Sequence, residues 1–116
     1  MQHYYINNYN TGIVIDEKFR IFELSPTHSR KSFYGKCKVI ENEAGYYLQS
    51  YNTIVCGFEF GNFIRYWSGY SVTTMRHINA FLVFLGFACN IGGKKWWNCL
   101  EVNKEYTTHD ILNIGY

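Results

Sequence analysis

The sequence predicts an α+β fold: a small antiparallel β-meander of three to five strands, packed against one main helix, with a short second helix. Two observations support this prediction. The segments with strand patterns lie between residues 12 and 67, and the longest helical pattern, residues 71–86, follows them. Strands that precede helices, instead of alternating with them, are typical of domains with an antiparallel sheet.

The N-terminal part contains two short strand patterns and a loop. Residues 1–12 are rich in Tyr and Asn and favour no particular element. Short strands are expected at residues 12–15 and 19–24, around a turn at residues 16–17. Residues 25–32 have the composition of a loop.

The clearest β region is the middle of the chain, which predicts a meander of three antiparallel strands. Polar and apolar side chains alternate near its start, as they do in a half-buried strand. Its second stretch is either one long strand or a bent pair, and Gly57 is a candidate bulge because glycine inside a strand often marks one. The final turn begins with Gly61, which suits a type II′ hairpin. The expected strands are 33–41, 46–60 and 63–67, with turns at 42–45 and 61–62.

Residues 71–86 predict the main helix. Ser71, Thr73 and Thr74 are residue types that cap helix starts, and Gly86 suits a helix end. One apolar stripe at helical spacing should pack on the sheet. This stripe consists of Met75, Ile78, Phe81, Leu82 and Leu85. A short second helix is expected at 94–100, and a further helical turn at 107–112.

The outer face of the main helix is unusually apolar. Two interpretations are open: the C-terminal tail or the tryptophan pair that follows the helix covers this face, or the face is an exposed patch for a partner or a second copy of the chain. The candidate partner-binding residues are Arg76, Ala80, Val83, Phe84, Trp96 and Trp97.

The start of the same helix is a candidate anion site, because free backbone N–H groups and the helix dipole attract negative charge there. Together with basic side chains and stacking tyrosines, it makes binding of single-stranded DNA or RNA an alternative function. The alternative is that the helix start is simply capped and solvated and binds no anion. The residues assigned to anion or nucleic-acid binding are Arg30, Lys31, Lys36, Lys38, Arg65, Thr73, Thr74, Arg76, His77, Lys94 and Lys95.

Composition fits one folded domain. The chain has 116 residues, 47% of them hydrophobic and 17% charged, which suffices for one core. A net charge of +2 is far below the excess typical of duplex-DNA binders. The aromatic content of 20% fits either a β-rich core or a contact surface. We expect a single domain over residues 1–116, with an extension at 1–32, a βββα core at 33–97 and a tail at 98–116.

The sequence contains no recognisable catalytic or metal-binding motif. The nine acidic residues form no paired motif, and no nucleophile motif places a serine or cysteine relative to His77. The cysteines, Cys37, Cys56, Cys89 and Cys99, lack the close spacing of metal knuckles. We therefore expect no enzyme activity, no cofactor and no metal. Because the N-terminus has no secretory pattern and the longest uncharged stretch is too short to span a bilayer, we expect a cytoplasmic protein with reduced thiols and no membrane contact.

Several motifs, taken in order, resemble a family of small uncharacterised proteins from bacteriophages and mobile elements of low-GC bacteria. They are Ser-Tyr-x-Thr-x-Val at 50–55, Thr-Thr-x-Arg-His-Ile-x-x-Phe-Leu at 73–82, and the pair Lys94 and Lys95. The resemblance implies no biochemical activity, because none is established for that family. Ala80, Val83 and Phe84 depart from it, because these outer positions are commonly charged there.

The phage context implies a function by analogy alone. Small phage proteins with non-catalytic surfaces often block host defence complexes. The resemblance therefore implies an anti-CRISPR-type inhibitor that contacts a host protein or ribonucleoprotein effector in the bacterial cytoplasm. A homodimer is a second arrangement that the apolar helix face leaves open.

Overall fold

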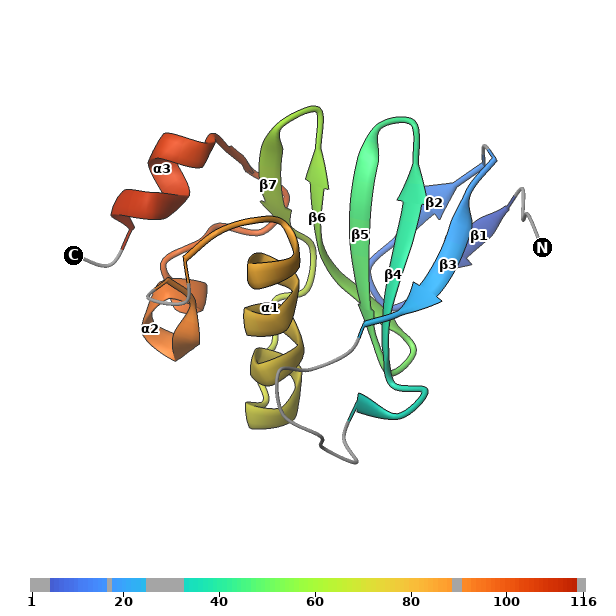
Figure 1. Ribbon diagram of the computed structural model, residues 1–116, viewed down its shortest axis with the longest axis horizontal. Coiled ribbons are helices and arrows are strands. Elements are labelled where there is room, and N and C mark those ends of the chain that lie inside the picture. The colour runs from blue at the N-terminus through green and yellow to red at the C-terminus, as the bar shows by residue number, and fades with distance from the viewer. Residues whose placement is uncertain (1–4, 17, 25–32, 89–90, 115–116) are drawn as a thin grey trace.

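A computed structural model describes residues 5–16, 18–24, 33–88 and 91–114. It confirms an α+β fold with antiparallel sheets (Figure 1). The main sheet has six strands in the order β3-β4-β5-β6-β7-β8, and β1 and β2 form a separate pair. The strands are β1 (Ile6–Asn8), β2 (Ile13–Ile15), β3 (Arg20–Glu23), β4 (Cys37–Asn42), β5 (Gly45–Ser50), β6 (Thr53–Glu59), β7 (Asn62–Arg65) and β8 (Glu105–Tyr106); the helices are α1 (Val72–Phe84), α2 (Gly93–Asn98) and α3 (Thr108–Asn113).

The expectation of three to five strands was too low. The edge strand β3 matches the short strand expected at residues 19–24, whereas β8, at the other edge, was not predicted. β8 has only two residues, and alternation over so few residues is too short to be recognised in a sequence. β3 lies within the expected extension 1–32, yet it pairs with β4 along its whole length.

The two faces of the main sheet are covered by different parts of the chain. α1 lies across one face (Figure 1), and the main core fills the space between the sheet and the helices. The β1–β2 pair packs on the other face, where Ile15 joins Ile40, Tyr47 and Ile54 in a second apolar cluster. Side-chain amides of Asn8 and Asn10 donate to the carbonyl oxygen of Asn52, which ties this pair to the β5–β6 turn.

The middle of the chain folds as the bent pair rather than as one long strand. β5 and β6 pair in antiparallel fashion around Tyr51 and Asn52, and Tyr51 takes a positive φ of 56°. The next hairpin differs from the expected turn, because its two loop residues are Phe60 and Gly61, with φ of 51° and 83°. Two positive φ values define a type I′ turn instead of type II′.

The bulge lies at Val55, not at Gly57. Leu48 pairs with Cys56 and Gln49 pairs with Ile54, so Val55 is the extra residue. Its carbonyl oxygen accepts from the N–H groups of both Tyr66 and Trp67. Gly57 keeps regular pairing and is needed for space: a Cβ there would lie 2.9 Å from a ring carbon of Tyr47.

The ends of α1 follow the sequence prediction. The Ser71 hydroxyl accepts from the Thr74 N–H at 3.0 Å, which caps the start. At the other end Gly86 has φ of 99°, and the Phe87 N–H donates to the Leu82 carbonyl oxygen at 2.9 Å. This Schellman arrangement satisfies carbonyl groups that the helix leaves unpaired.

The inner stripe of α1 is also confirmed, but the buried face is wider than predicted. Met75, Ile78, Phe81 and Leu82 are buried and Leu85 is half-buried. The helices α2 and α3 lie where short helices were expected, and Thr107 and Asp110 form a capping box at the start of α3.

Arg65, at the end of β7, is buried in a cage of backbone carbonyl oxygens. Its side chain is 5% exposed, and its guanidinium carbon Cζ lies 4.3 Å from the centre of the Trp97 ring. No carboxylate pairs with it among the described residues. The acceptors are the carbonyl oxygens of Trp67, Ser68, Gly69, Trp97 and Leu100, at 2.7–3.3 Å.

The cage connects three parts of the fold. Three acceptors belong to the segment between β7 and α1, and two belong to the end of α2 and the residues after it. Burial lowers the pKa of Arg65, but an arginine side chain stays charged in proteins. The cage therefore replaces the water that this charge loses on folding.

Replacing Arg65 by Met should strongly destabilise the protein, because buried carbonyl oxygens would lose their donors. Each such loss costs about 1–3 kcal/mol, so we expect the free energy of unfolding to fall by at least about 3 kcal/mol. Urea unfolding followed by circular dichroism measures this change. Arg65→Lys keeps the charge with fewer donors and should recover only part of the loss. A Met variant as stable as the parent would contradict the cage's structural role.

Candidate functional site

The structure separates the six candidate partner-binding residues into two groups. Trp96 and Trp97 are 3% and 0% exposed, so they belong to the core and are removed from the contact surface. Their indole N–H groups donate to backbone carbonyl oxygens of Ile111 and Gly69. The sequence could not give this placement, because tryptophan pairs are common both in cores and at interfaces.

The other four lie on α1 and reach the surface to different extents. Arg76 is exposed, and Ala80 is half-buried. Val83 and Phe84 are 48% and 39% exposed, respectively. Of the two interpretations of the outer face, the exposed patch is therefore the one that the structure supports among the described residues.

Phe84 belongs to a larger group of aromatic side chains, which we call the aromatic patch. Its ring centre lies 5.7 Å from that of Phe22 and 5.1 Å from that of Tyr46, and the rings of Phe58 and Phe87 lie 6.0 Å apart. Apart from Phe84, the members are half-buried. The aromatic patch consists of Phe22, Tyr46, Phe58, Phe84 and Phe87.

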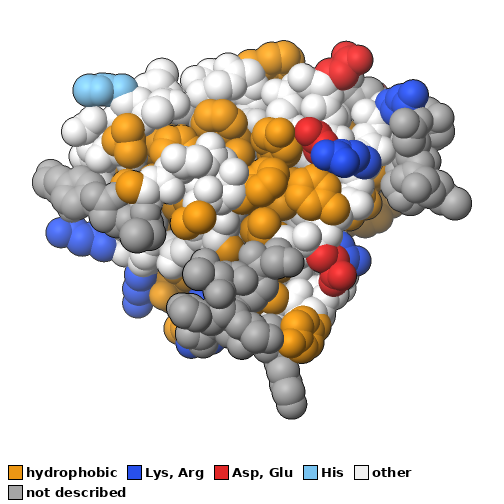
Figure 2. All heavy atoms as spheres, viewed as in Figure 1, with side chains coloured by type: hydrophobic (Ala, Val, Ile, Leu, Met, Phe, Trp, Pro, Cys, Tyr) orange, Lys and Arg blue, Asp and Glu red, His pale blue; other side chains and the backbone are white. Residues whose placement is uncertain are grey.

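The patch lies where α1 ends. In Figure 1, β5 and β6 continue past the C-terminal end of α1, and the side chains of Tyr46 and Phe58 on these strands stay partly exposed. Figure 2 shows apolar side chains gathered in the middle of this face. The sequence signal was alternation: Tyr46 and Phe58 are paired residues on the same side of the sheet as Leu48 and Cys56.

An ion pair lies at the margin of the patch. Register across the sheet places Arg20 opposite Glu41 and Glu41 opposite Tyr46, so all three point to the helix-facing side. Arg20 forms an ion pair with Glu41, and its guanidinium lies 5.2 Å from the ring centre of Phe22. An apolar centre with a charged margin is the usual anatomy of a protein interface.

Thr74 and His77, which were assigned to anion binding, lie in the core instead. There they contact Ser50, so they connect two of the sequence motifs on which the family resemblance is based. The Ser50 hydroxyl lies 2.9 Å from the Thr74 hydroxyl and 2.8 Å from Nδ1 of His77. Thr74 and His77 are 5% and 0% exposed, and the His77 ring packs edge-on against Phe33. They are therefore corrected to buried structural residues, which cannot reach a surface phosphate in this conformation.

Arg65 is removed from the anion-binding set for the same reason, since its donors are used by the carbonyl cage. Arg30 and Lys31 lie outside the described residues. Lys36 lies 5.8 Å from the ring centre of Tyr51, and Lys94 lies 5.2 Å from that of Tyr70. The remaining members are exposed or half-exposed: Lys36, Lys38, Thr73, Arg76, Lys94 and Lys95.

Among the hollows on the described surface, two are lined in part by charged side chains. The first, about 270 Å³, is lined by Lys18, Phe19, Arg20, Glu41, Asn42 and Glu43, beside the aromatic patch. The second, about 300 Å³, is lined by Lys104, Tyr106, His109, Asp110, Asn113 and Ile114.

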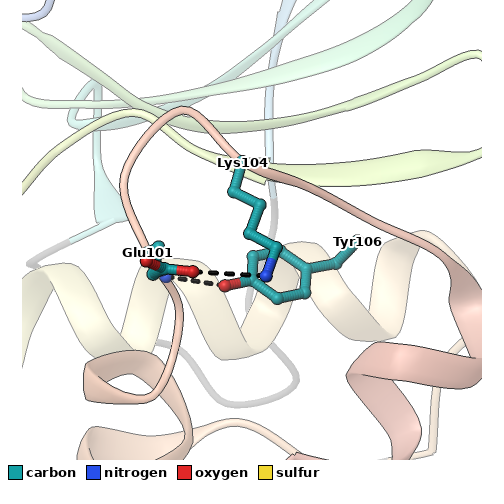
Figure 3. Close-up of polar contacts among 3 residues, drawn as sticks. All are labelled: Glu101, Lys104 and Tyr106. Atoms are coloured by element: carbon teal, nitrogen blue, oxygen red, sulfur yellow. Dashed lines mark hydrogen bonds and ion pairs between the residues drawn. The ribbon is translucent and has the colours of Figure 1, made fainter.

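The second hollow borders a loop that is held by its own side chains. Figure 3 shows Lys104 paired with the Glu101 carboxylate at 3.2 Å, while the Tyr106 hydroxyl accepts from the Glu101 N–H at 2.8 Å. Lys104 also lies over the Tyr106 ring. These contacts shape the return of the chain to β8, so their first role is structural.

No helix in the described ranges is long and apolar enough to cross a membrane. Within the same ranges, no three side chains of the metal-ligating types His, Cys, Asp and Glu are grouped closely enough to hold an ion.

Comparison with known proteins identifies one family. A model described as a family of unknown function (DUF8033) matches residues 22–98. No curated protein and no solved structure matches the chain. The matched range runs from within β3 to the end of α2, and it contains the whole aromatic patch.

The cysteines give a test of the described core. Burial raises the pKa of Cys37 to about 12, and burial together with the nearby Cys37 raises that of Cys56. Cys99 is exposed. At pH 8 only about one Cys37 thiol in 10,000 would be ionised, and the thiolate is the reactive form.

We expect iodoacetamide at pH 8 to alkylate Cys99 while sparing Cys37 and Cys56. Peptide mass spectrometry of the folded protein reads out each site. Protein unfolded in guanidinium is the control, and all three residues should be labelled there. Fast labelling of Cys37 in the folded protein would show that this part of the core is open.

Proposed function

Because this chain belongs to DUF8033, a family without an assigned function, we propose a function from its own surface: it is a non-catalytic binding protein that contacts a partner protein through the aromatic patch.

The observation that carries this proposal is the open group of rings at the end of α1. Phe84 is 39% exposed although it contacts Phe22 and Tyr46, and Val83 beside it is 48% exposed. Clustered apolar side chains that remain open to solvent usually mark an interaction site. Large aromatic side chains also supply much of the binding energy at protein interfaces.

The chemistry of the patch favours a protein over a small molecule. Its rings form a broad surface, and the hollow beside it is lined by charged residues of both signs. The Arg20–Glu41 pair at the margin would set orientation more than affinity, because exposed ion pairs contribute little energy.

The motif resemblance suggests which partner to test. Phage and mobile-element proteins of this size often act on host defence, so we propose a defence effector of the CRISPR-Cas type as the partner, with inhibition resulting from binding. The identity of the partner is proposed from the motif resemblance, whereas the binding surface is proposed from the structure. An experiment can therefore reject one of these proposals and leave the other intact.

The double substitution Val83→Glu/Phe84→Glu should abolish partner binding, because it places two charges where apolar surface would be buried. Truncation of a central interface residue commonly costs about 2 kcal/mol or more, which corresponds to a loss of roughly 30-fold in affinity. Affinity capture from bacterial lysate, followed by titration with the captured protein, measures the change.

Val72→Glu is the matched control, since Val72 is 58% exposed at the opposite end of the same helix. It should retain binding, and circular dichroism should confirm that all variants fold. If the double variant kept every partner, the aromatic patch would be excluded as the interface.

The alternative function is binding of single-stranded nucleic acid. Its support is the pairing of basic side chains with aromatic rings: Lys36 lies over Tyr51, which is 44% exposed, and Lys94 lies over Tyr70. Such pairs could contact a phosphate and a base together.

If this alternative holds, affinity for single-stranded DNA or RNA should fall steeply as salt rises. Each phosphate contact contributes about −0.7 to the slope of log K against log salt for single strands. Lys36→Ala/Lys94→Ala should flatten that slope, while Val83→Glu/Phe84→Glu should leave it unchanged. Fluorescence anisotropy with labelled oligonucleotides tests this, and a weak, salt-insensitive signal would reject nucleic-acid binding.

A further inference from the structure

We propose that the partner contributes an extended segment, which pairs with the free edge of β3 and places its side chains against the aromatic patch. This inference rests on the proposed function, since it specifies how the patch is used. The proposed ligand of this edge is a strand-forming segment of another protein.

On its outer side, the backbone of β3 has hydrogen-bonding groups for which the described residues provide no strand partner. The Leu24 N–H donates to the Cys37 carbonyl oxygen at 3.0 Å, which identifies residue 24 as facing β4. Groups alternate in direction along an antiparallel strand. The N–H and C=O groups of Phe22 therefore also face β4, while those of Ile21 and Glu23 point outward.

No described strand occupies this outer side, because β3 is the terminal strand of the main sheet. Ile21, an outward position, is also 39% exposed. Its backbone groups and those of Glu23 can accept a strand from outside.

The charges that would normally discourage such pairing are already engaged. Exposed edges are often protected by charged side chains, proline or bulges. Here Arg20 is paired with Glu41, and the Glu23 carboxylate accepts from the Gly35 N–H at 2.6 Å. The register of β3 with β4 is regular and contains no bulge.

The edge and the patch are continuous through Phe22. This residue lies on β3, and its ring contacts that of Phe84 on α1. A strand added beside β3 would direct alternate side chains to the helix-facing side, next to Phe22. Backbone bonding at the edge and apolar contact at the patch would then come from one segment, as in other β-strand additions.

This geometry defines the chemistry of the segment. It should be extended, with apolar side chains at alternating positions. Backbone groups of every second residue should bond to Ile21 and Glu23. A helical or purely electrostatic ligand would not satisfy both requirements.

The test uses the full chain and a random dodecapeptide display library as the probe. Selected peptides are synthesised, and their binding is measured by calorimetry. Hydrogen exchange by NMR should show at least tenfold slower exchange of the Ile21 and Glu23 amides on binding. N-methylation of alternate peptide residues should weaken affinity at least tenfold, and methylation of the intervening residues should not.

Two variants separate the edge from the patch. Ile21→Pro removes one outward donor, a change that edge strands tolerate, and should reduce affinity at least tenfold. Ile21→Thr keeps that donor and should bind nearly as well as the parent. Circular dichroism must show that both variants are folded.

The outcomes differ for the two proposals. If Val83→Glu/Phe84→Glu loses the peptide and Ile21→Pro keeps it, the patch function stands and strand addition is overturned. If Ile21→Pro loses it and the patch variant keeps it, pairing at the edge of β3 stands, but the aromatic patch is excluded as an interface and the proposed contact of the segment with the patch is overturned.

Other results would overturn strand addition directly. These are a selection that yields no binder, binders without protection of the Ile21 and Glu23 amides, or a dimer by light scattering that Ile21→Pro converts to a monomer. The last result would assign the edge to a second copy of the chain.

Discussion

The buried guanidinium of Arg65 is the constraint on which the arrangement of the helices depends. A charge in the core must be solvated by the protein, and here backbone carbonyl oxygens do so in place of a carboxylate. Because those oxygens belong to the segment before α1 and to the end of α2, the cage fixes both segments relative to β7. Trp97 lies over the guanidinium and is fully buried, so α2 is held by packing as well as by hydrogen bonds.

The position and length of α1 determine which surface the sheet leaves open. The helix begins at its Ser71 cap, close to the cage, and ends before Gly86. Thirteen helical residues span about 20 Å, and β5 and β6 continue past the C-terminal end of the helix (Figure 1). The aromatic patch is the uncovered remainder. It follows that a residue such as Phe84 is open because of where the helix stops.

Polar residues inside the core show how motif residues can be read in two ways. Thr74 and His77 belong to a motif that suggested an anion site, yet both bond to Ser50 beneath the helix. Their pattern in the sequence is compatible with a surface site or with a buried network. Only the pairing of β5 with its neighbours brings Ser50 under α1, and that contact spans 27 residues of chain for His77.

The features that could be predicted from the sequence are those that depend on near neighbours: the caps of α1, its inner stripe, the positions of α2 and α3, and the α+β class. Such features arise from bonds and side-chain periodicity within a few residues. Only the packed chain reveals the bulge at Val55, the edge strand β8, the burial of Arg65 and Trp96, and the membership of the aromatic patch. These depend on which distant segments meet. Burial in particular is a property of the packed chain, because the same tryptophan or arginine is stable in a core or at a surface according to the partners it finds there.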